Sequence, residues 1–251
     1  MTITAQPIRT TATKRVPMTS LRKTALVAGA LYLLTFVSIP TLALYGPVRD
    51  PNFVVGPGPD TPVMIGGILE MIVALAGIGT AVVLYPVVKR QNEALALGFV
   101  GVRVLEAATI FGCVVSLLSI VTLRKDGAGA DALVTGQALV AFHDWIFLLG
   151  QSFLPAVNAL LLGTLLYRSR LVPRGLPLLG FVGAALLVIA FTATLFSGGQ
   201  VSALAGLFAI PIAVWEFSLG VYLIVKGFKP SPITAEMTAA DTRSAYQDAT
   251  V

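Results

Sequence analysis

A chain of 251 residues that is 56% hydrophobic and only 12% charged is unlike a water-soluble domain, in which about 25% of residues are charged. A mean hydropathy of +0.88 also excludes an ordinary water-soluble fold. The net charge of +5 does not indicate nucleic-acid binding, because the basic residues flank apolar runs and form no patch interleaved with aromatic residues. We therefore expect the lipid bilayer, and no nucleic acid, as the partner of this chain.

Six apolar runs are long enough to cross a hydrocarbon core of ~30 Å as helices that rise about 1.5 Å per residue. Lipid offers no partners to backbone N–H and C=O groups, so each run must satisfy them within itself as a helix. The sequence predicts an all-α fold, a polytopic membrane helical bundle within residues 22–228. Its six transmembrane helices are expected at 24–45, 62–85, 94–123, 144–167, 176–196 and 201–225.

Polar segments flank and connect these runs. Residues 1–21 form a basic, Thr-rich tail, and residues 229–251 begin Pro-Ser-Pro and continue as a polar run, so we expect both tails to be disordered. The Pro- and Gly-rich loop at 46–62 predicts turns and extended segments. Residues 126–142 are compatible either with a short amphipathic helix on the outer surface or with an extension of the fourth span.

The basic residues indicate the direction of threading. The tails and the second and fourth loops hold 13 of the 17 Lys and Arg residues, whereas the other side holds only Arg49, Arg124 and Lys125. Because cytoplasmic loops are enriched in Lys and Arg, this predicts a multi-pass protein of a bacterial inner or plasma membrane with both termini in the cytoplasm.

Ionisable residues inside the apolar runs are the strongest candidates for a site, because each costs roughly 2.5 to 3.5 kcal/mol at a helix centre. At ~1.5 Å per residue, Arg103, Glu216 and Asn158 fall about 14 Å from the cytoplasmic ends of their runs. By the same rise, Glu106 falls at about 18 Å and Glu70 at about 23 Å. Such depths predict a polar intramembrane cluster, and Pro155 and Pro211 are expected to break the helices beside it.

His143 and Asp144 are adjacent at the predicted outer end of the fourth span. The simplest interpretation is that Asp144 caps that helix and His143 lies at the membrane interface. With one histidine and one cysteine in the chain and no metal-ligand spacing, we expect no metal site, and no motif predicts a cofactor.

Four stretches resemble the bacterial membrane family known as domain of unknown function 4386. They are Arg22–Leu34 (RKTALVAGALYLL), Leu97–Glu106 (LGFVGVRVLE), Leu162–Arg174 (LGTLLYRSRLVPR) and Glu216–Phe228 (EFSLGVYLIVKGF). The resemblance covers roughly residues 22–229 and implies an integral membrane protein of a family without an assigned activity. The resemblance also implies that Arg103, Glu106 and Glu216 belong to a sequence pattern that members of this family share.

Three functions are compatible with these residues. The first is a non-catalytic structural role, in which the polar cluster locks the helices and the surface meets other membrane proteins. The second is a small transporter or proton-linked carrier that binds its solute at Glu106 or Glu216. The third is a membrane enzyme using His143, Asp144 and Glu70, which the predicted depth of Glu70 disfavours. The structural role and the transporter predict different surroundings for the polar cluster. In the structural role its side chains pack against one another without a cavity, whereas in a transporter they border one.

Overall fold

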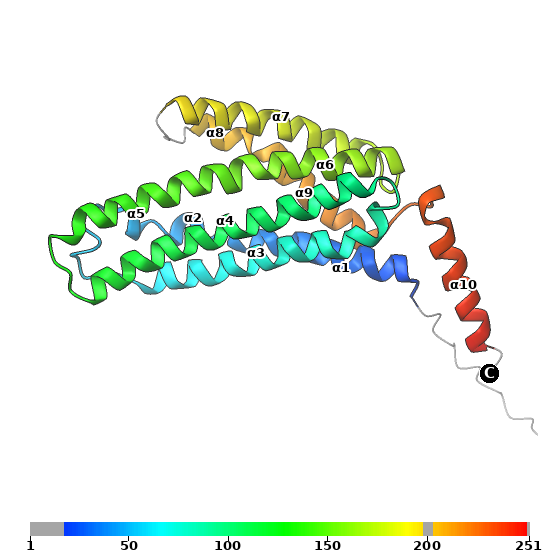
Figure 1. Cartoon of the computed structure of the whole chain (residues 1–251), viewed down its shortest axis with the longest axis horizontal. Coiled ribbons are helices and arrows are strands. Elements are labelled where there is room, and N and C mark those ends of the chain that lie inside the picture. The colour runs from blue at the N-terminus through cyan, green and yellow to red at the C-terminus, as the bar shows by residue number, and fades with distance from the viewer. Residues whose placement is uncertain (1–17, 198–202, 250–251) are drawn as a thin grey trace, which may run out of the picture.

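The computed structural model describes residues 18–197 and 203–249, and all regular structure within these ranges is helical (Figure 1). The long helices are α1 (Ser20–Leu34), α3 (Thr61–Val88), α4 (Glu93–Lys125), α5 (Ala132–Phe147), α6 (Leu154–Ser169), α7 (Gly175–Phe196), α9 (Ile210–Val225) and α10 (Ala235–Ala249). Shorter elements are η1 (Thr35–Ser38), α2 (Thr41–Leu44), η2 (Pro47–Arg49), η3 (Leu148–Phe153), α8 (Ala203–Phe208) and η4 (Pro232–Thr234).

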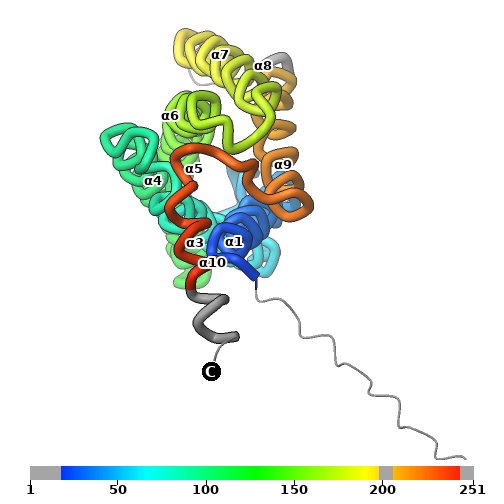
Figure 2. The backbone as a smooth tube through the Cα atoms, turned by 90° about the vertical axis from the view of Figure 1, so that its right-hand side faces the viewer, coloured from blue at the N-terminus to red at the C-terminus, as the bar shows by residue number. Residues whose placement is uncertain are grey.

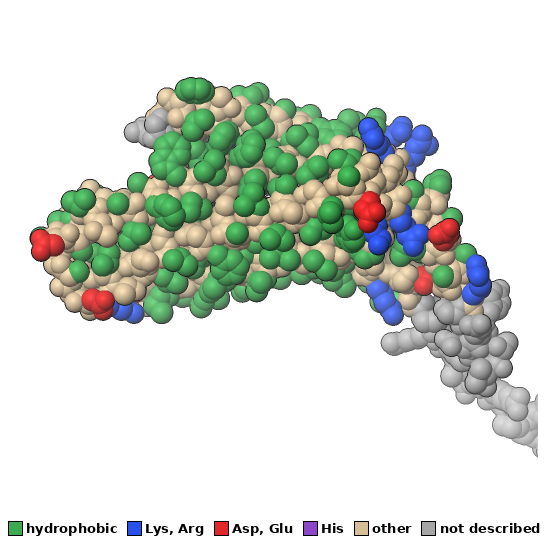
Figure 3. All heavy atoms as spheres, viewed as in Figure 1, with side chains coloured by type: hydrophobic (Ala, Val, Ile, Leu, Met, Phe, Trp, Pro, Cys, Tyr) green, Lys and Arg blue, Asp and Glu red, His purple; other side chains and the backbone are tan. Residues whose placement is uncertain are grey.

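Six helical runs in the described part of the chain are long and apolar enough to cross a membrane. They cover Ser20–Leu44, Thr61–Val88, Glu93–Lys125, Ala132–Ser169, Gly175–Phe196 and Gly206–Val225. Large apolar side chains also cover the outside of the bundle (Figure 3). Leu42 is 81% exposed and Phe196 is 85% exposed, which suits contact with lipid and not with water. The predicted all-α bundle of six spans is confirmed.

The spans form a closed ring. Each of α1, α3, α4, α6, α7 and α9 packs against the next in that order, and α9 packs back against α1. The view along the bundle shows this ring (Figure 2). Helices α1 and α9 approach closely because Gly29 and Gly220 face each other, and a Cβ atom on Gly29 would lie 2.6 Å from the Gly220 carbonyl oxygen.

The two largest apolar cores hold the ring. The larger core surrounds Tyr32, Phe99 and Trp215, and the smaller one surrounds Tyr45 and Ile120. Lys and Arg side chains gather at the end of the bundle that carries α10, which we call the basic end (Figure 3). Ser20, at the start of α1, donates from its hydroxyl to Asp241 of α10 at 2.9 Å. The first and last described helices therefore meet at the basic end.

Three spans are interrupted just before a proline. The first passes from α1 into the 3-10 turn η1 and then into a turn at Ile39, next to Pro40. The π-helical segment η3 joins α5 to α6 immediately before Pro155, and the last span breaks at Ala209, two residues before Pro211. A proline supplies no N–H to the preceding turn and its ring clashes with that turn, so the helix widens or breaks there. The interruptions before Pro155 and Pro211 were predicted from the sequence, whereas the one before Pro40 was not.

The structure differs from the sequence expectations at several boundaries. The fourth span begins at Ala132 and not at 144, so residues 132–142 extend this span. Helix α1 begins at Ser20, within the expected tail, because the Thr19 hydroxyl caps it by accepting from Arg22 N. Residues 1–17 of that tail and 201–202 of the predicted sixth span lie outside the described residues.

The C-terminal segment was expected to be disordered, but it contains η4 and α10. Five alanines in the 15 residues of α10 favour helix, and contacts with the bundle hold this helix in place. Besides the Ser20 contact, Glu236 pairs with Arg90 at 3.2 Å.

Candidate functional site

Arg103 of α4 is the centre of a buried polar cluster. Its Nη1 donates to Glu106 Oε2 at 3.0 Å on the same helix, and its Nη2 donates to Glu216 Oε1 of α9 at 2.8 Å. Asn158 of α6 donates from Nδ2 to the same Glu106 oxygen at 2.6 Å. We call Arg103, Glu106, Asn158 and Glu216 the inner cluster. The structure brings these four predicted residues together, whereas Glu70 makes no hydrogen bond or ion pair with them.

Aromatic rings fix the guanidinium. Arg103 lies over the ring of Tyr32 from α1 at 5.6 Å and over the ring of Phe99, one turn earlier on α4, at 5.8 Å. Ring faces attract a cation electrostatically, and they exclude water from it. Arg103 is only 4% exposed, so its position is set by contacts with α1, α4 and α9.

The inner cluster carries more acid than base. One guanidinium faces two carboxyl groups, so the ionised cluster holds one negative charge in excess. In residues 18–197 and 203–249, no donor reaches the second oxygen of either Glu106 or Glu216. The side chain of Glu216 is 18% exposed against 11% for Glu106, so Glu216 is the more accessible acid.

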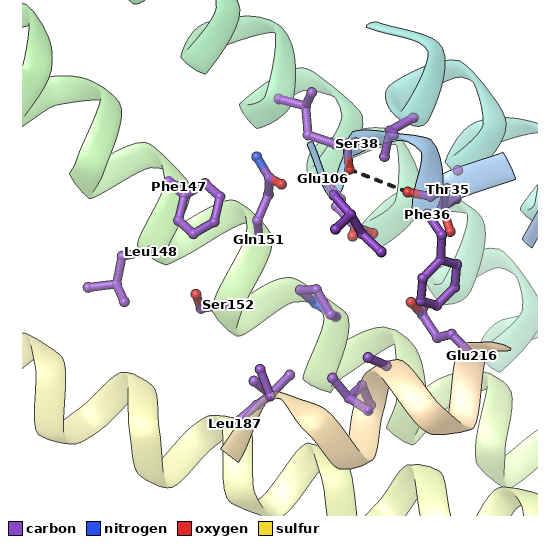
Figure 4. A pocket seen from close by; sticks show the side chains of 18 of the residues that line it. Thr35, Phe36, Ser38, Glu106, Phe147, Leu148, Gln151, Ser152, Leu187 and Glu216 are labelled. Carbon is purple, nitrogen blue, oxygen red and sulfur yellow. Dashed lines mark hydrogen bonds between the residues drawn. The ribbon is translucent and has the colours of Figure 1, made fainter. Parts of the chain in front are cut away.

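A cavity of about 480 Å³ adjoins the inner cluster inside the ring. Arg103, Glu106 and Glu216 line one part of it, and the rest is mainly apolar. Figure 4 shows Glu106 and Glu216 on one side of this cavity, with Phe147 and Leu148 on the other. The interrupted helices contribute to its wall through η3 and the start of α9. The inner cluster therefore borders a void.

Glu70 of α3 belongs to a second buried group. Its carboxyl lies beside the Tyr45 hydroxyl and the Gln151 amide, with His143 within the range of charge interaction. The rings of Tyr45 and His143 meet edge to face, with centroids 6.0 Å apart. Gly66, one turn before Glu70, makes room for the Tyr45 ring, which occupies the place of a side chain at that position. We call Tyr45, Glu70, His143 and Gln151 the Glu70 group.

The expected role of Asp144 as a helix cap was wrong. Neither Asp144 nor His143 lies at a helix end, because the span starts at Ala132, and His143 is 3% exposed within the bundle. Asp144 does not cap a helix; it pairs with Arg49 at 2.9 Å and with His143 Nδ1 at 3.0 Å. Taking residue 144 as the outer end of the span separated His143 from Glu70, whereas the structure brings them together.

Sequence reasoning missed Tyr45, Gln151 and Tyr32 as parts of these groups. Gln151 could have been identified from the sequence, because an amide four residues before a proline in an apolar run needs a partner inside the bundle. The aromatic residues carried none, because a tyrosine near the end of a span is ordinarily an interface anchor. Within the described residues, no group of three or more His, Cys, Asp or Glu side chains could hold a metal ion.

The fold and the cavity define a polytopic helical membrane protein with a polar site inside its ring of spans. The chain belongs to the family described as domain of unknown function (DUF4386), whose sequence model matches residues 27–227 and so covers all six spans almost completely. The resemblance seen in the sequence is confirmed. No curated protein and no solved structure matches the chain.

Proposed function

We propose that this protein is a small carrier that binds a monovalent organic cation in its central cavity. The observation that supports the proposal is the excess carboxylate of the inner cluster at the wall of a cavity that is otherwise mainly apolar. A positive charge placed beside Glu216 would complete the charge balance, and the apolar wall would accept a hydrophobic body.

The cavity has the size and lining that such a ligand requires. Small-molecule sites usually measure about 300 to 1,000 Å³ and combine apolar walls with a few polar groups. The rings of Phe36, Phe147 and Phe191 line this one at about 480 Å³. Aromatic faces attract alkylammonium groups, so they favour a cation over a neutral compound of equal shape.

Interrupted helices support movement of the ligand as well as binding. Carriers commonly build their midplane sites from broken helices, whose halves can shift relative to one another. All three interruptions border the cavity, at η1, η3 and Ala209. A purely structural role requires the ion pairs between helices, but it requires neither a cavity nor interrupted helices. It therefore explains fewer features of this bundle than a carrier does.

Benzyltrimethylammonium is a suitable probe because it has a permanent charge and an aromatic body. Its neutral isostere, neopentylbenzene, is the matched control ligand. We expect the purified protein in detergent to bind the cation and not the isostere, and Glu216→Gln to weaken binding at least tenfold, which is about 1.4 kcal/mol. The exposed Glu93 provides the control variant Glu93→Gln, which should bind normally.

Uptake of the same cation into proteoliposomes tests the carrier step. We expect flux with the wild-type protein and none with Glu216→Gln, while the circular dichroism spectrum and the melting temperature of the variant stay close to wild type. Equal binding of cation and isostere, or equal uptake by wild type and variant, would contradict the proposal and favour the structural role.

A further inference from the structure

The Glu70 group contains four buried polar atoms that lack partners in the described part of the chain. They are Tyr45 Oη, Glu70 Oε2, His143 Nε2 and Gln151 Nε2. Their residues come from four separate places: the end of α2, α3, α5 and η3. Buried polar atoms are nearly always hydrogen-bonded, so four unpartnered ones in one group indicate a site for an exchangeable species and not a packing accident.

Three side chains of this group are also deeply buried, which makes unpartnered polar atoms unfavourable. Tyr45 is 6% exposed, Glu70 3% and His143 3%. An unpaired carboxylate in such surroundings is expensive, and a bound proton removes its charge. The group also contains donors and acceptors for either state: the tyrosine and amide can donate to a carboxylate, and imidazole Nε2 can accept from a carboxylic acid.

Polar side chains connect Glu70 with the exposed Arg49 on one side and with the cavity on the other. On the outer side, His143 Nδ1 lies 3.0 Å from Asp144 Oδ1, and Asp144 pairs with Arg49, whose side chain is 53% exposed. On the inner side, Gln151 lies beside Glu70 and also lines the cavity that Glu106 and Glu216 border. In Figure 4 Gln151 stands between Phe147 and Glu106. Glu70 thus lies between the end of the bundle opposite the basic end and the cavity.

We propose that Glu70 is a proton-binding site that exchanges protons with the Arg49 end through His143 and couples this exchange to cation binding in the cavity. The coupling rests on the proposed function, whereas the proton site stands without it. One proton moves from the imidazolium of His143 to the Glu70 carboxylate, leaving neutral imidazole and a neutral acid, and no electron is transferred.

The sign of the coupling follows from charge. Ionised Glu70 adds a negative charge near the cavity and favours a bound cation, and protonation removes that attraction. A unit charge about 10 Å away, at an effective dielectric constant of about 20, changes affinity roughly tenfold. The titratable neighbours of Glu70 are Tyr45, Cys113 and His143, with Asp144 and Arg49 behind His143. Cation affinity should therefore fall as pH falls.

Infrared spectroscopy tests the proton site without any ligand. Difference spectra of the detergent-purified full chain between roughly pH 5 and pH 8 should contain a C=O band of a protonated, dehydrated carboxyl group. Glu70→Gln should remove this band, Tyr45→Phe should shift it by deleting a neighbouring hydroxyl, and Glu93→Gln should leave it unchanged. A band that neither Glu70→Gln nor Tyr45→Phe alters would overturn the site.

Binding of benzyltrimethylammonium tests the coupling, because this cation has no proton to lose. We expect wild-type affinity to fall roughly tenfold over the same pH range and the affinity of Glu70→Gln to change much less. An equal pH dependence in both proteins would overturn the coupling and leave the infrared result standing. Failure of every variant and the wild type to bind the cation would refute the carrier function, and the infrared result would still decide the proton site.

Discussion

Arg103 and Glu216 are 113 positions apart in the sequence and join α4 to α9 through a hydrogen-bonded ion pair of 2.8 Å. The pair links opposite sides of the ring, since α4 neighbours α3 and α6 whereas α9 neighbours α1 and α7. It therefore has two consequences that can be separated by experiment: it holds the ring across its centre, and it places a carboxylate at the cavity.

Removing one partner of this ion pair should lower the free energy of unfolding more than removing both partners. Arg103→Met leaves two acids facing each other in an apolar interior, and loss of one partner of a buried pair costs about 3 to 5 kcal/mol. Arg103→Met combined with Glu216→Met leaves Glu106, which still accepts from Asn158. We expect the double variant to unfold at a higher temperature than the single one, yet to lose cation binding.

Thermal unfolding in detergent checks this order of stability. Arg168→Met, at an exposed site at the basic end, is the control for loss of a positive charge and should melt close to wild type. A double variant that melts below Arg103→Met would mean that the two side chains stabilise the fold by separate contacts.

A close approach of backbones should make Gly29 intolerant of any side chain. Gly29→Ala places a methyl group against the Gly220 carbonyl and Ile224 of α9, so we expect a loss of about 1 to 3 kcal/mol through overpacking. Gly101→Ala is the matched control, because no neighbouring element among the described residues lies within 4 Å of a Cβ atom there, and alanine raises helix propensity by up to about 1 kcal/mol. Comparison of the two melting temperatures measures the difference, and equal values would contradict the α1–α9 packing.

Much of this fold follows from hydropathy, and the inner cluster follows from helix rise. Arg103, Asn158 and Glu216 had equal estimated depths because an α-helix converts residue number into distance at a constant rate. His143 was misplaced because residue 144 was taken as the outer end of the fourth span, while the polar residues Asp131, Thr135 and Gln137 concealed its true start at Ala132. Helix α10 was missed because its order depends on contacts such as Ser20 with Asp241, which local composition does not contain.

The two ends of the bundle should lie on different sides of the membrane. In a Cys113→Ala background, Ala239→Cys places a thiol on α10 at the basic end and Ala128→Cys places one in the loop after α4, and both positions are exposed. Because Lys and Arg favour the cytoplasmic side, we expect an impermeant maleimide to label position 128 in intact cells and position 239 only after permeabilisation. The reverse pattern would invert the predicted topology.

Filling the cavity should abolish binding without disturbing the bundle. Ala107 and Ala108 are adjacent on α4, but Ala107 is buried at the cavity wall whereas Ala108 is exposed on the outer surface. Ala107→Phe directs a ring into the space that the cation would occupy, so we expect at least a tenfold loss of benzyltrimethylammonium affinity, about 1.4 kcal/mol. Ala108→Phe adds the same ring on the outside of the bundle and should bind as wild type does. Isothermal titration of the two variants in detergent, with melting temperatures recorded alongside, measures both effects. Loss of affinity in both variants would point to altered helix packing, and normal affinity in both would show that the cation binds outside this cavity.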